Sequence, residues 1–347
     1  MRHGLIVAVC VAHVGMMMAF IMWCMFDATS FSSRAGRIRK ERRMIASMPR
    51  HPVSFAAPPP PKNFRVLCWN VFLRPDILDD AQHTRAQLIG DYIISLAPEV
   101  LVLQEVFSKH ALEMVSRLRM MGWHWRSKGL RSSTHVEDGG IVILSRIPCL
   151  ATSGHVFRNA SAVSADSLAA KGVVHMSLRC GEDVLHIFGT HFQSGWSGAN
   201  EATRAAQAGE SCDFIRRRVR DTGAVLFCGD FNAAPHEGSI DIVRRTLRLA
   251  LPQNTSSLPT YDPLTNFMVG CDGDGADVLE RSCMFPCMRG CTKAQLDYFL
   301  VRQHPRFHFE SAQASPLYPL SPEPYQFRLG FTRQLSDHYP VLLDVRQ

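Results

Sequence analysis

The 347-residue chain has an apolar fraction of 46% and a formal net charge of +7, values ordinary for one large globular domain or two small ones. The charge is unevenly placed: residues 1–62 hold nine Lys or Arg and two acids, whereas residues 63–347 hold 29 of each. This neutral main body argues against a general nucleic-acid binder, which usually has a basic body.

The N-terminal region contains a 22-residue apolar segment, Leu5–Phe26, without Asp, Glu, Lys or Arg. About 20 such residues are enough for a helix that crosses a bilayer, so we expect a single-pass membrane anchor. A cleaved signal peptide is the alternative, but its apolar core is usually shorter. The basic cluster Arg34–Arg43 follows the segment, which favours a cytoplasmic body and contact with anionic lipid headgroups.

Residues 44–62 end in AAPPPPK, which predicts a stiff, extended linker between the anchor region (1–43) and a catalytic body (63–347). Strands are expected at Phe64–Phe72, Val100–Val106, Ile141–Ser145, Val173–Leu178, Val184–His191, Ala224–Asn232, Leu296–Val301 and Tyr339–Val345. Helices are expected at Arg85–Pro98, Ser108–Gly122 and Asn200–Arg220. Strands with a helix between them imply crossovers, and the adjoining strands from Ile141 to His191 imply hairpins. This mixture predicts an α/β fold of the α+β type, a four-layer α/β/β/α sandwich with two packed mixed sheets.

One Gly-rich stretch of the body holds four cysteines, Cys271, Cys283, Cys287 and Cys291. They could bind zinc, form two disulfides or remain free thiols. Their spacing is not the C-x-x-C pair of common zinc modules, so we favour disulfides or free thiols.

Polar side chains stand where the apolar strands end or begin: Asn70, Glu105, His191, Asp230, Asn232, Asp297, Asp337 and His338. Each alone is more often a cap or a solvated edge than a ligand. Together they predict that several strands end at one site, because so many polar residues at strand ends are unlikely to occur by chance.

The residue types in this set indicate phosphoester chemistry. Glu105 with nearby amide oxygens suits a hard cation such as Mg²⁺. His338 is the natural general base because its pKa is near neutral, and Asp297 is the candidate to fix its tautomer. His191 and Asn232 can donate hydrogen bonds to phosphoryl oxygens in the transition state. We therefore expect a metal-assisted hydrolase of phosphate esters with water as the nucleophile.

The order WN … QEV … GTH … GDFN … LDY … SDH resembles the endonuclease/exonuclease/phosphatase superfamily, the deoxyribonuclease-like sandwich, over essentially all of residues 63–347. LVLQEVF, DGGIVILSR, GTHFQS, TYDPLTN and SADSLAAKGVV resemble its neutral sphingomyelinase branch more than its nucleases. The resemblance implies a phospholipase-C-type phosphodiesterase that converts sphingomyelin or a related phosphosphingolipid to ceramide and a phosphorylated headgroup. A nuclease or an inositol-phosphate phosphatase on the same fold is the alternative, although we expect no nucleic-acid partner.

The resemblance also implies where the metal and the phosphate lie. Mg²⁺, with Mn²⁺ as a substitute, would lie at Glu105 and Asn70. Asp230 and Asn232 would lie at the scissile phosphate, and His191 would stabilise the transition state.

Asp297 and His338 would form the base unit, with Asp230 as the alternative proton acceptor and Asp337 in an outer supporting position. Two residues match an aspartate–lysine pair with which that branch controls its active site: Asp166 and Lys171. The oligomeric state stays open.

The segment Pro316–Phe327, PLYPLSPEPYQF, lies between LDY and SDH and is rich in aromatic residues. Aromatic side chains favour the membrane interface, so we expect this loop to enter the headgroup layer. The alternative is that its side chains fold back into the core.

Overall fold

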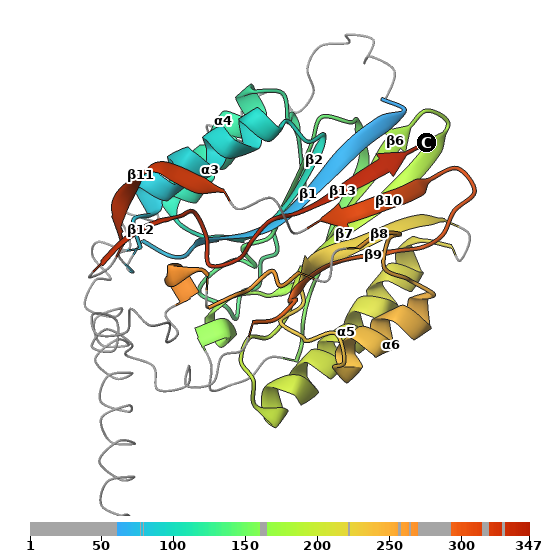
Figure 1. The fold of residues 1–347 in the computed structure, drawn as a ribbon. Coiled ribbons are helices and arrows are strands. Elements are labelled where there is room, and N and C mark those ends of the chain that lie inside the picture. Colours follow the sequence, from blue (N-terminus) through green and yellow to red (C-terminus); the bar gives the residue numbers. More distant parts are fainter. Residues whose placement is uncertain are drawn as a thin grey trace, which may run out of the picture. The chain divides into compact units, whose positions relative to one another are not determined.

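Two mixed sheets form the centre of the fold (Figure 1). The structure is a computed structural model that describes residues 61–347 apart from 77, 79, 160–164, 221–222, 256–257, 264, 270–292, 314–318 and 328–329. The first sheet has the order β10 (His308–Gln313), β13 (Val341–Arg346), β1 (Asn63–Leu73), β2 (Val100–Val106), β4 (Val142–Ser145) and β3 (Trp125–Arg126). The second has the order β5 (Cys149–Val156), β6 (Gly172–Cys180), β7 (Asp183–His191), β8 (Ala224–Asp230) and β9 (Asp297–Val301).

The two sheets mix parallel and antiparallel pairs. β1 runs parallel to β2 and β7 runs parallel to β8, whereas the other paired strands are antiparallel. A separate two-stranded hairpin joins β11 (Leu320–Phe327) and β12 (Gly330–Gln334).

Helices cover the outer faces of both sheets (Figure 1). On the first sheet these are α3 (Gln82–Leu96) and α4 (Lys109–Met120), and on the second they are α5 (Gly198–Arg218) and α6 (Gly238–Leu247). Two single-turn helices, η1 (Ala165–Leu168) and η2 (Phe267–Val269), lie in connecting segments. The layers confirm the predicted α/β/β/α sandwich.

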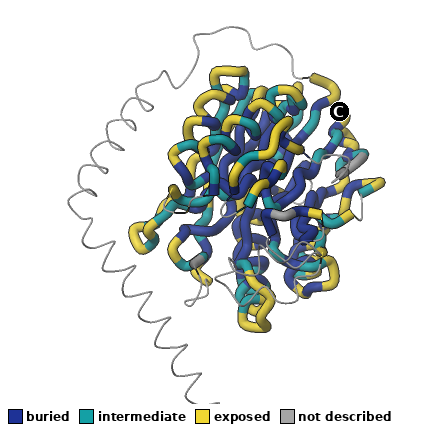
Figure 2. Tube along the Cα trace, turned by 60° about the vertical axis from the view of Figure 1, so that its left-hand side comes forward, coloured by how far each residue is buried: buried dark blue, intermediate teal, exposed yellow. Residues whose placement is uncertain are grey.

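The alternation of side chains along β1 shows why the sheet is covered on both faces. Val66 and Cys68 pack into the core between the sheets, whereas Leu67 and Trp69 pack under the helices. All four are buried, as are most strand residues in the interior (Figure 2). Burial of a large apolar side chain contributes about 1.5–3 kcal/mol, so these strands form the stable frame of the site.

The eight strands and three helices predicted from the sequence are present, with boundary shifts of up to three residues. The apolar patterns did not predict β3, β5, α6, β10 or the β11–β12 hairpin. β5 lies at a sheet edge, and its side chains are mostly exposed or half-buried, so it lacks an apolar run.

The structure does not support the predicted single-pass N-terminal anchor. In the part of the chain that the structure describes, no helix is long and apolar enough to cross a membrane. Leu5–Phe26 itself lies outside the described residues, as do the basic flank, nearly all of the linker and the four clustered cysteines. The predicted membrane localisation therefore has no support.

Candidate functional site

Strand register brings the predicted polar residues together at one end of the two sheets. In the second sheet, His191 at the end of β7 pairs with Asp230 at the end of β8, and Asp230 pairs with Asp297 at the start of β9. In the first sheet, β1 and β2 run parallel and pair Asn70 with Gln104, the residue before Glu105. Parallel strands that end together place their terminal side chains at one edge, which explains the convergence.

Asn70 links the two sheets through its side chain. Its amide nitrogen donates to Oε1 of Glu105 (3.0 Å) and to Oδ2 of Asp230 (3.1 Å). Its amide oxygen accepts a hydrogen bond from the backbone N–H of Phe72 (3.0 Å), which fixes the orientation of the amide. Asn70 therefore holds two carboxylates toward one point.

Glu105 has the properties of a cation ligand. Its backbone has φ of 57°, a strained conformation for a residue other than glycine, of the kind that clusters at functional sites. Burial, followed by repulsion from Asp337, raises its pKa to about 7. A positive ion would relieve both effects, and carboxylate oxygens are the ligands that Mg²⁺ prefers, so the residues present fit a divalent cation.

His338 and Asp297 form a buried hydrogen-bonded pair. Nδ1–H of His338 donates to Oδ2 of Asp297 (2.8 Å), which leaves Nε2 as the basic nitrogen, 3.7 Å from Oδ2 of Asp230. Burial opposes protonation of His338, but the negative charges of Asp297 and Asp230 outweigh it and raise the pKa well above the ordinary histidine value. The indole N–H of Trp69 donates to the His338 carbonyl (2.9 Å) and fixes the backbone here.

Asp230, Asp297 and His338 also have one ligand atom each within 4.8 Å of the others, a spacing that could suit a metal ion. The Nδ1–Oδ2 contact of 2.8 Å is already a hydrogen bond, however, so the histidine–aspartate pair is arranged for proton transfer. Glu105 is therefore a candidate cation ligand, and the Asp297–His338 pair is a candidate base.

His191 is buried next to a lysine. Nζ of Lys171 lies 3.2 Å from its Nε2, and because an ammonium group has no acceptor, the imidazole proton is on Nδ1. Nδ1 is buried and has no hydrogen-bond partner within the described residues. Burial and the charge of Lys171 lower the His191 pKa to about 4, so the ring is neutral at pH 7.

Lys171 and Asp166 form the predicted pair, with Nζ 2.9 Å from Oδ2. Burial opposes ionisation of Asp166, but Lys171 holds its pKa well below the usual range. The same carboxylate oxygen accepts hydrogen bonds from the Gln193 side chain (3.0 Å) and the Ser194 backbone (2.7 Å). The pair therefore ties η1 to the segment that follows His191.

The GDFN stretch makes a sharp turn at the end of β8. A side chain at Gly229 would place Cβ 2.1 Å from the carbonyl oxygen of Thr190, and its φ of 149° favours glycine. Asn232, at φ 49°, donates its backbone N–H to Oδ1 of Asp230 (2.8 Å) and its amide to the Phe192 carbonyl (3.1 Å). The turn therefore fixes the orientation of the Asp230 carboxylate through the hydrogen bond from the Asn232 backbone to Oδ1.

Asp337 lies near Glu105, since its negative charge contributes to the raised pKa of Glu105. Ser336, which the sequence analysis did not single out, donates its hydroxyl to the Asn70 carbonyl (2.6 Å) and accepts the His338 N–H (3.2 Å). The short SDH motif was the only signal that could have identified it.

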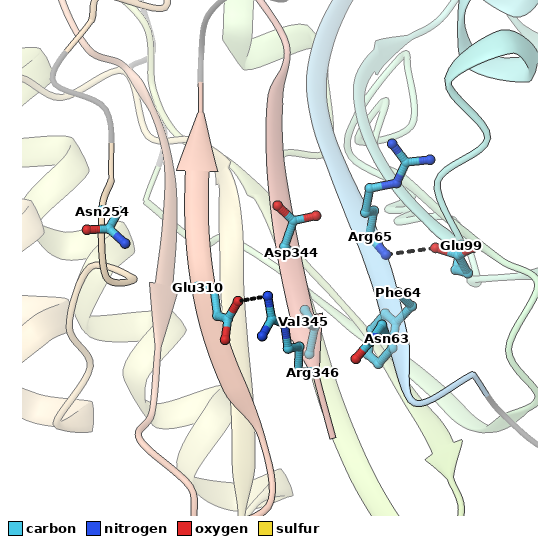
Figure 3. Close-up of a pocket in the computed structure, with 9 residues that line it drawn as sticks. All are labelled: Asn63, Phe64, Arg65, Glu99, Asn254, Glu310, Asp344, Val345 and Arg346. Carbon is cyan, nitrogen blue, oxygen red and sulfur yellow. Dashed lines mark hydrogen bonds and ion pairs between the residues drawn. The ribbon is translucent and has the colours of Figure 1, made fainter.

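A separate hollow of about 590 Å³ lies at the opposite end of β1 from Asn70 (Figure 3). Its lining includes the ion pair between Glu310 and Arg346 (2.6 Å) and the bond from the Arg65 backbone to Glu99 (2.7 Å). None of the predicted site residues lines it.

Comparison with known proteins agrees with this geometry. The model of the endonuclease/exonuclease/phosphatase family matches residues 67–338. A sphingomyelinase C of Listeria ivanovii is 28% identical over 308 residues, covering 81% of this chain and 86% of the relative. A phospholipase C of Staphylococcus aureus is 26% identical over 225 residues, covering 59% and 67%.

Solved structures show the same fold. The crystal structure of SmcL has a TM-score of 0.66 and 25% identity, and the match covers 82% of this chain and 99% of that one. A beta toxin of Staphylococcus aureus, in a structure with bound magnesium ions, has a TM-score of 0.65 and 21% identity, covering 81% and 99%.

Proposed function

Because the chain belongs to the endonuclease/exonuclease/phosphatase family, we propose that it is a phosphodiesterase of the phospholipase C type that hydrolyses sphingomyelin or a related phosphosphingolipid. The products are ceramide and the phosphorylated headgroup. The observation that carries the proposal is the convergence of Glu105, Asp230 and the Asp297–His338 pair at one end of the two sheets. The relatives named sphingomyelinase C and phospholipase C favour a lipid over a nucleic acid.

In this proposal the Asp297–His338 pair activates water. Asp297 accepts the hydrogen bond from Nδ1–H and orients the ring, so Nε2 receives a proton from water as the water oxygen attacks phosphorus. The bond from phosphorus to the ceramide oxygen breaks, and that oxygen takes a proton from solvent as ceramide leaves. The negative charges around His338 make Nε2 a stronger base than free imidazole. Asp230, 3.7 Å from Nε2, is the alternative acceptor and otherwise positions the phosphate.

His191 and Asn232 act on the phosphoryl oxygens. Nε2 of the neutral His191 ring lies 3.5 Å from Oδ2 of Asp230, the carboxylate proposed to position the phosphate, so the ring lies beside the phosphate in this proposal. Asn232 has a second amide hydrogen beyond the one that it donates to Phe192. A donor of this kind, held before the reaction, typically contributes about 10²–10³ in rate.

Glu105 is the proposed ligand of Mg²⁺, with Mn²⁺ as a substitute, and Asn70 orients its carboxylate. When bound, the ion would supply Lewis-acid stabilisation of the phosphoryl charge. Asp337 adds negative charge near Glu105, and Asp166 and Lys171 hold His191 in place.

The test is release of water-soluble phosphate ester from a panel of labelled sphingolipids by the full chain with magnesium. Inositol phosphates and plasmid DNA are the comparison substrates, and His338→Ala is the control for contaminating activity. We expect turnover of sphingomyelin, or of a phosphosphingolipid with another headgroup, that His338→Ala abolishes. Turnover of plasmid DNA or inositol phosphates alone would replace the proposal with one of the two alternatives.

A further inference from the structure

The two members of the proposed base come from separate segments, and something must hold them in register. Asp297 opens β9, whereas His338 lies 41 residues later, between β12 and β13. Their 2.8 Å hydrogen bond requires that these segments stay at a fixed separation. Thr260, the first residue of the TYDPLTN motif, is hydrogen-bonded to both segments.

Thr260 is 1% exposed and uses its side chain and backbone for this purpose. Its hydroxyl oxygen accepts hydrogen bonds from the backbone N–H groups of Leu296 (3.0 Å) and Asp297 (3.1 Å). Its carbonyl oxygen accepts the backbone N–H of Tyr339 (2.7 Å), the residue after His338. The same residue therefore fixes the start of β9 and the chain next to His338.

The rest of the motif supports this bridge. The ring of Tyr261 packs against the imidazole of His338, with centroids 5.3 Å apart. The Asn266 side chain donates to the Ser336 carbonyl (2.8 Å), two residues before His338. Tyr261 and Asn266 thus constrain the same segment from other sides, whereas Thr260 alone of the motif accepts from the Asp297 backbone through its side chain.

We propose that Thr260 is a positioning residue of the proposed phosphodiesterase: its hydroxyl and carbonyl oxygens set the separation of β9 from the His338–Tyr339 segment and so keep Asp297 hydrogen-bonded to His338. The expected loss of kcat rests on the proposed function, whereas the expected change in the Asp297–His338 hydrogen bond rests on the geometry alone. Small misplacements of a catalytic group cost large factors in rate, and about 1 Å can cost 10²-fold.

The test removes the hydroxyl acceptor without changing the shape of the side chain. Thr260→Val is nearly isosteric and leaves two buried N–H groups without their acceptor, whereas Thr260→Ser keeps the acceptor. We expect Thr260→Val to lower kcat about 10- to 100-fold with KM changed less than about threefold. Thr260→Ser should stay within about threefold of the parent in kcat. Thr260→Cys, whose sulfur is a weak acceptor, should fall between them.

A matched control separates positioning from stability. Ser145 is also buried, and its hydroxyl accepts the backbone N–H of Ile147 (2.9 Å). It pairs with Val100 at the start of β2, the end of that strand opposite to Glu105. Ser145→Ala should lower the Tm while leaving kcat unchanged. The inference would be overturned by equal kcat in Thr260→Val and the parent, or by a fall in kcat in Ser145→Ala as large as that in Thr260→Val for a similar drop in Tm.

A second readout does not depend on the substrate. The proton in the His338–Asp297 hydrogen bond should give a downfield NMR signal, assigned by its loss in Asp297→Asn. Asp230, Asp337 and Asp297 are the charged groups that act on this imidazole. We expect Thr260→Val to shift the signal upfield or broaden it and Thr260→Ser to retain it. An unchanged signal in Thr260→Val would contradict the inference, whereas a changed signal in a chain without lipid turnover would contradict only the proposed function.

Discussion

Glu105 is the residue at which the metal requirement is tested. Glu105→Gln keeps the shape of the side chain but removes the negative charge, and we expect a loss of at least about 100-fold in kcat because a metal supplies several kcal/mol of charge stabilisation. The measurement is kcat as a function of magnesium concentration, with circular dichroism as the check on folding. Full activity in a chelator, or an unaffected Glu105→Gln enzyme, would contradict the assignment.

His338 predicts the direction of the pH dependence. A base works when deprotonated, so kcat/KM should fall as the pH drops through its pKa, which Asp297 and Asp230 raise above the ordinary value. Asp297→Asn removes one of these negative charges, so the pKa falls and the acid limb should move to lower pH. The measurement is the pH profile of kcat/KM for the parent and the variant.

His338→Ala is the companion variant, in which most of the activity and the acid limb itself should vanish. A limb that stays in place in Asp297→Asn would show that His338 is not the titrating base and would favour Asp230 as the proton acceptor.

At the scale of elements, the β11–β12 hairpin bears on the expectation for Pro316–Phe327, of which residues 316–318 lie outside the described part of the chain. Phe327 is 7% exposed and packs with Phe72 and Met268, so this aromatic side chain folds into the protein. Among the described residues of the hairpin, the exposed large apolar side chains are Leu320 (48%) and Phe331 (77%). This segment pairs with β12 despite its two prolines, with a register shift between Leu320 and Tyr325, so its sequence carries no regular strand pattern.

The hairpin still offers a test of contact with a lipid surface. Replacing Leu320 and Phe331 together with serine should lower hydrolysis in vesicles about tenfold, because apolar side chains favour the membrane interface. Hydrolysis of a water-soluble chromogenic phosphodiester should be unchanged. Phe327→Ser is the matched control and should lower the Tm and both activities. Equal losses on both substrates in the Leu320 and Phe331 variant would show that the hairpin is structural.

At the scale of the whole molecule, the sequence predicted the elements whose pattern is local and the residues whose chemistry is distinctive. Apolar runs identified the inner strands, and the polar residues at their ends, such as Glu105 and His338, indicated the site. The residues that hold the site segments in place could not be predicted, because their hydrogen-bond partners are distant in sequence. Arg85 lies in a predicted helix, yet its buried guanidinium donates to the carbonyls of Phe72 (2.7 Å) and Leu335 (2.9 Å). No periodicity encodes such a contact.

The charge distribution of the chain predicts a salt dependence that distinguishes lipid hydrolysis from nucleic-acid hydrolysis. Residues 63–347 hold 29 basic and 29 acidic groups, so the folded body has no net charge with which to attract a polyanion. We expect a truncated chain from Pro59 to Gln347 to hydrolyse sphingomyelin in neutral mixed micelles with kcat/KM changed less than about threefold between about 50 and 200 mM salt.

A nuclease that makes six to ten phosphate contacts loses about 10³–10⁵ in affinity over that same range of salt, because binding releases counterions. The measurement is therefore a paired salt titration of lipid turnover and plasmid cleavage by the truncated chain, with His338→Ala in the same background as the control. The lipid reading would be contradicted by a preparation that cleaves plasmid in a steeply salt-dependent way and does not turn over lipid. Local basic patches would then bind DNA although the body has no net charge. The site would then act on nucleic acid.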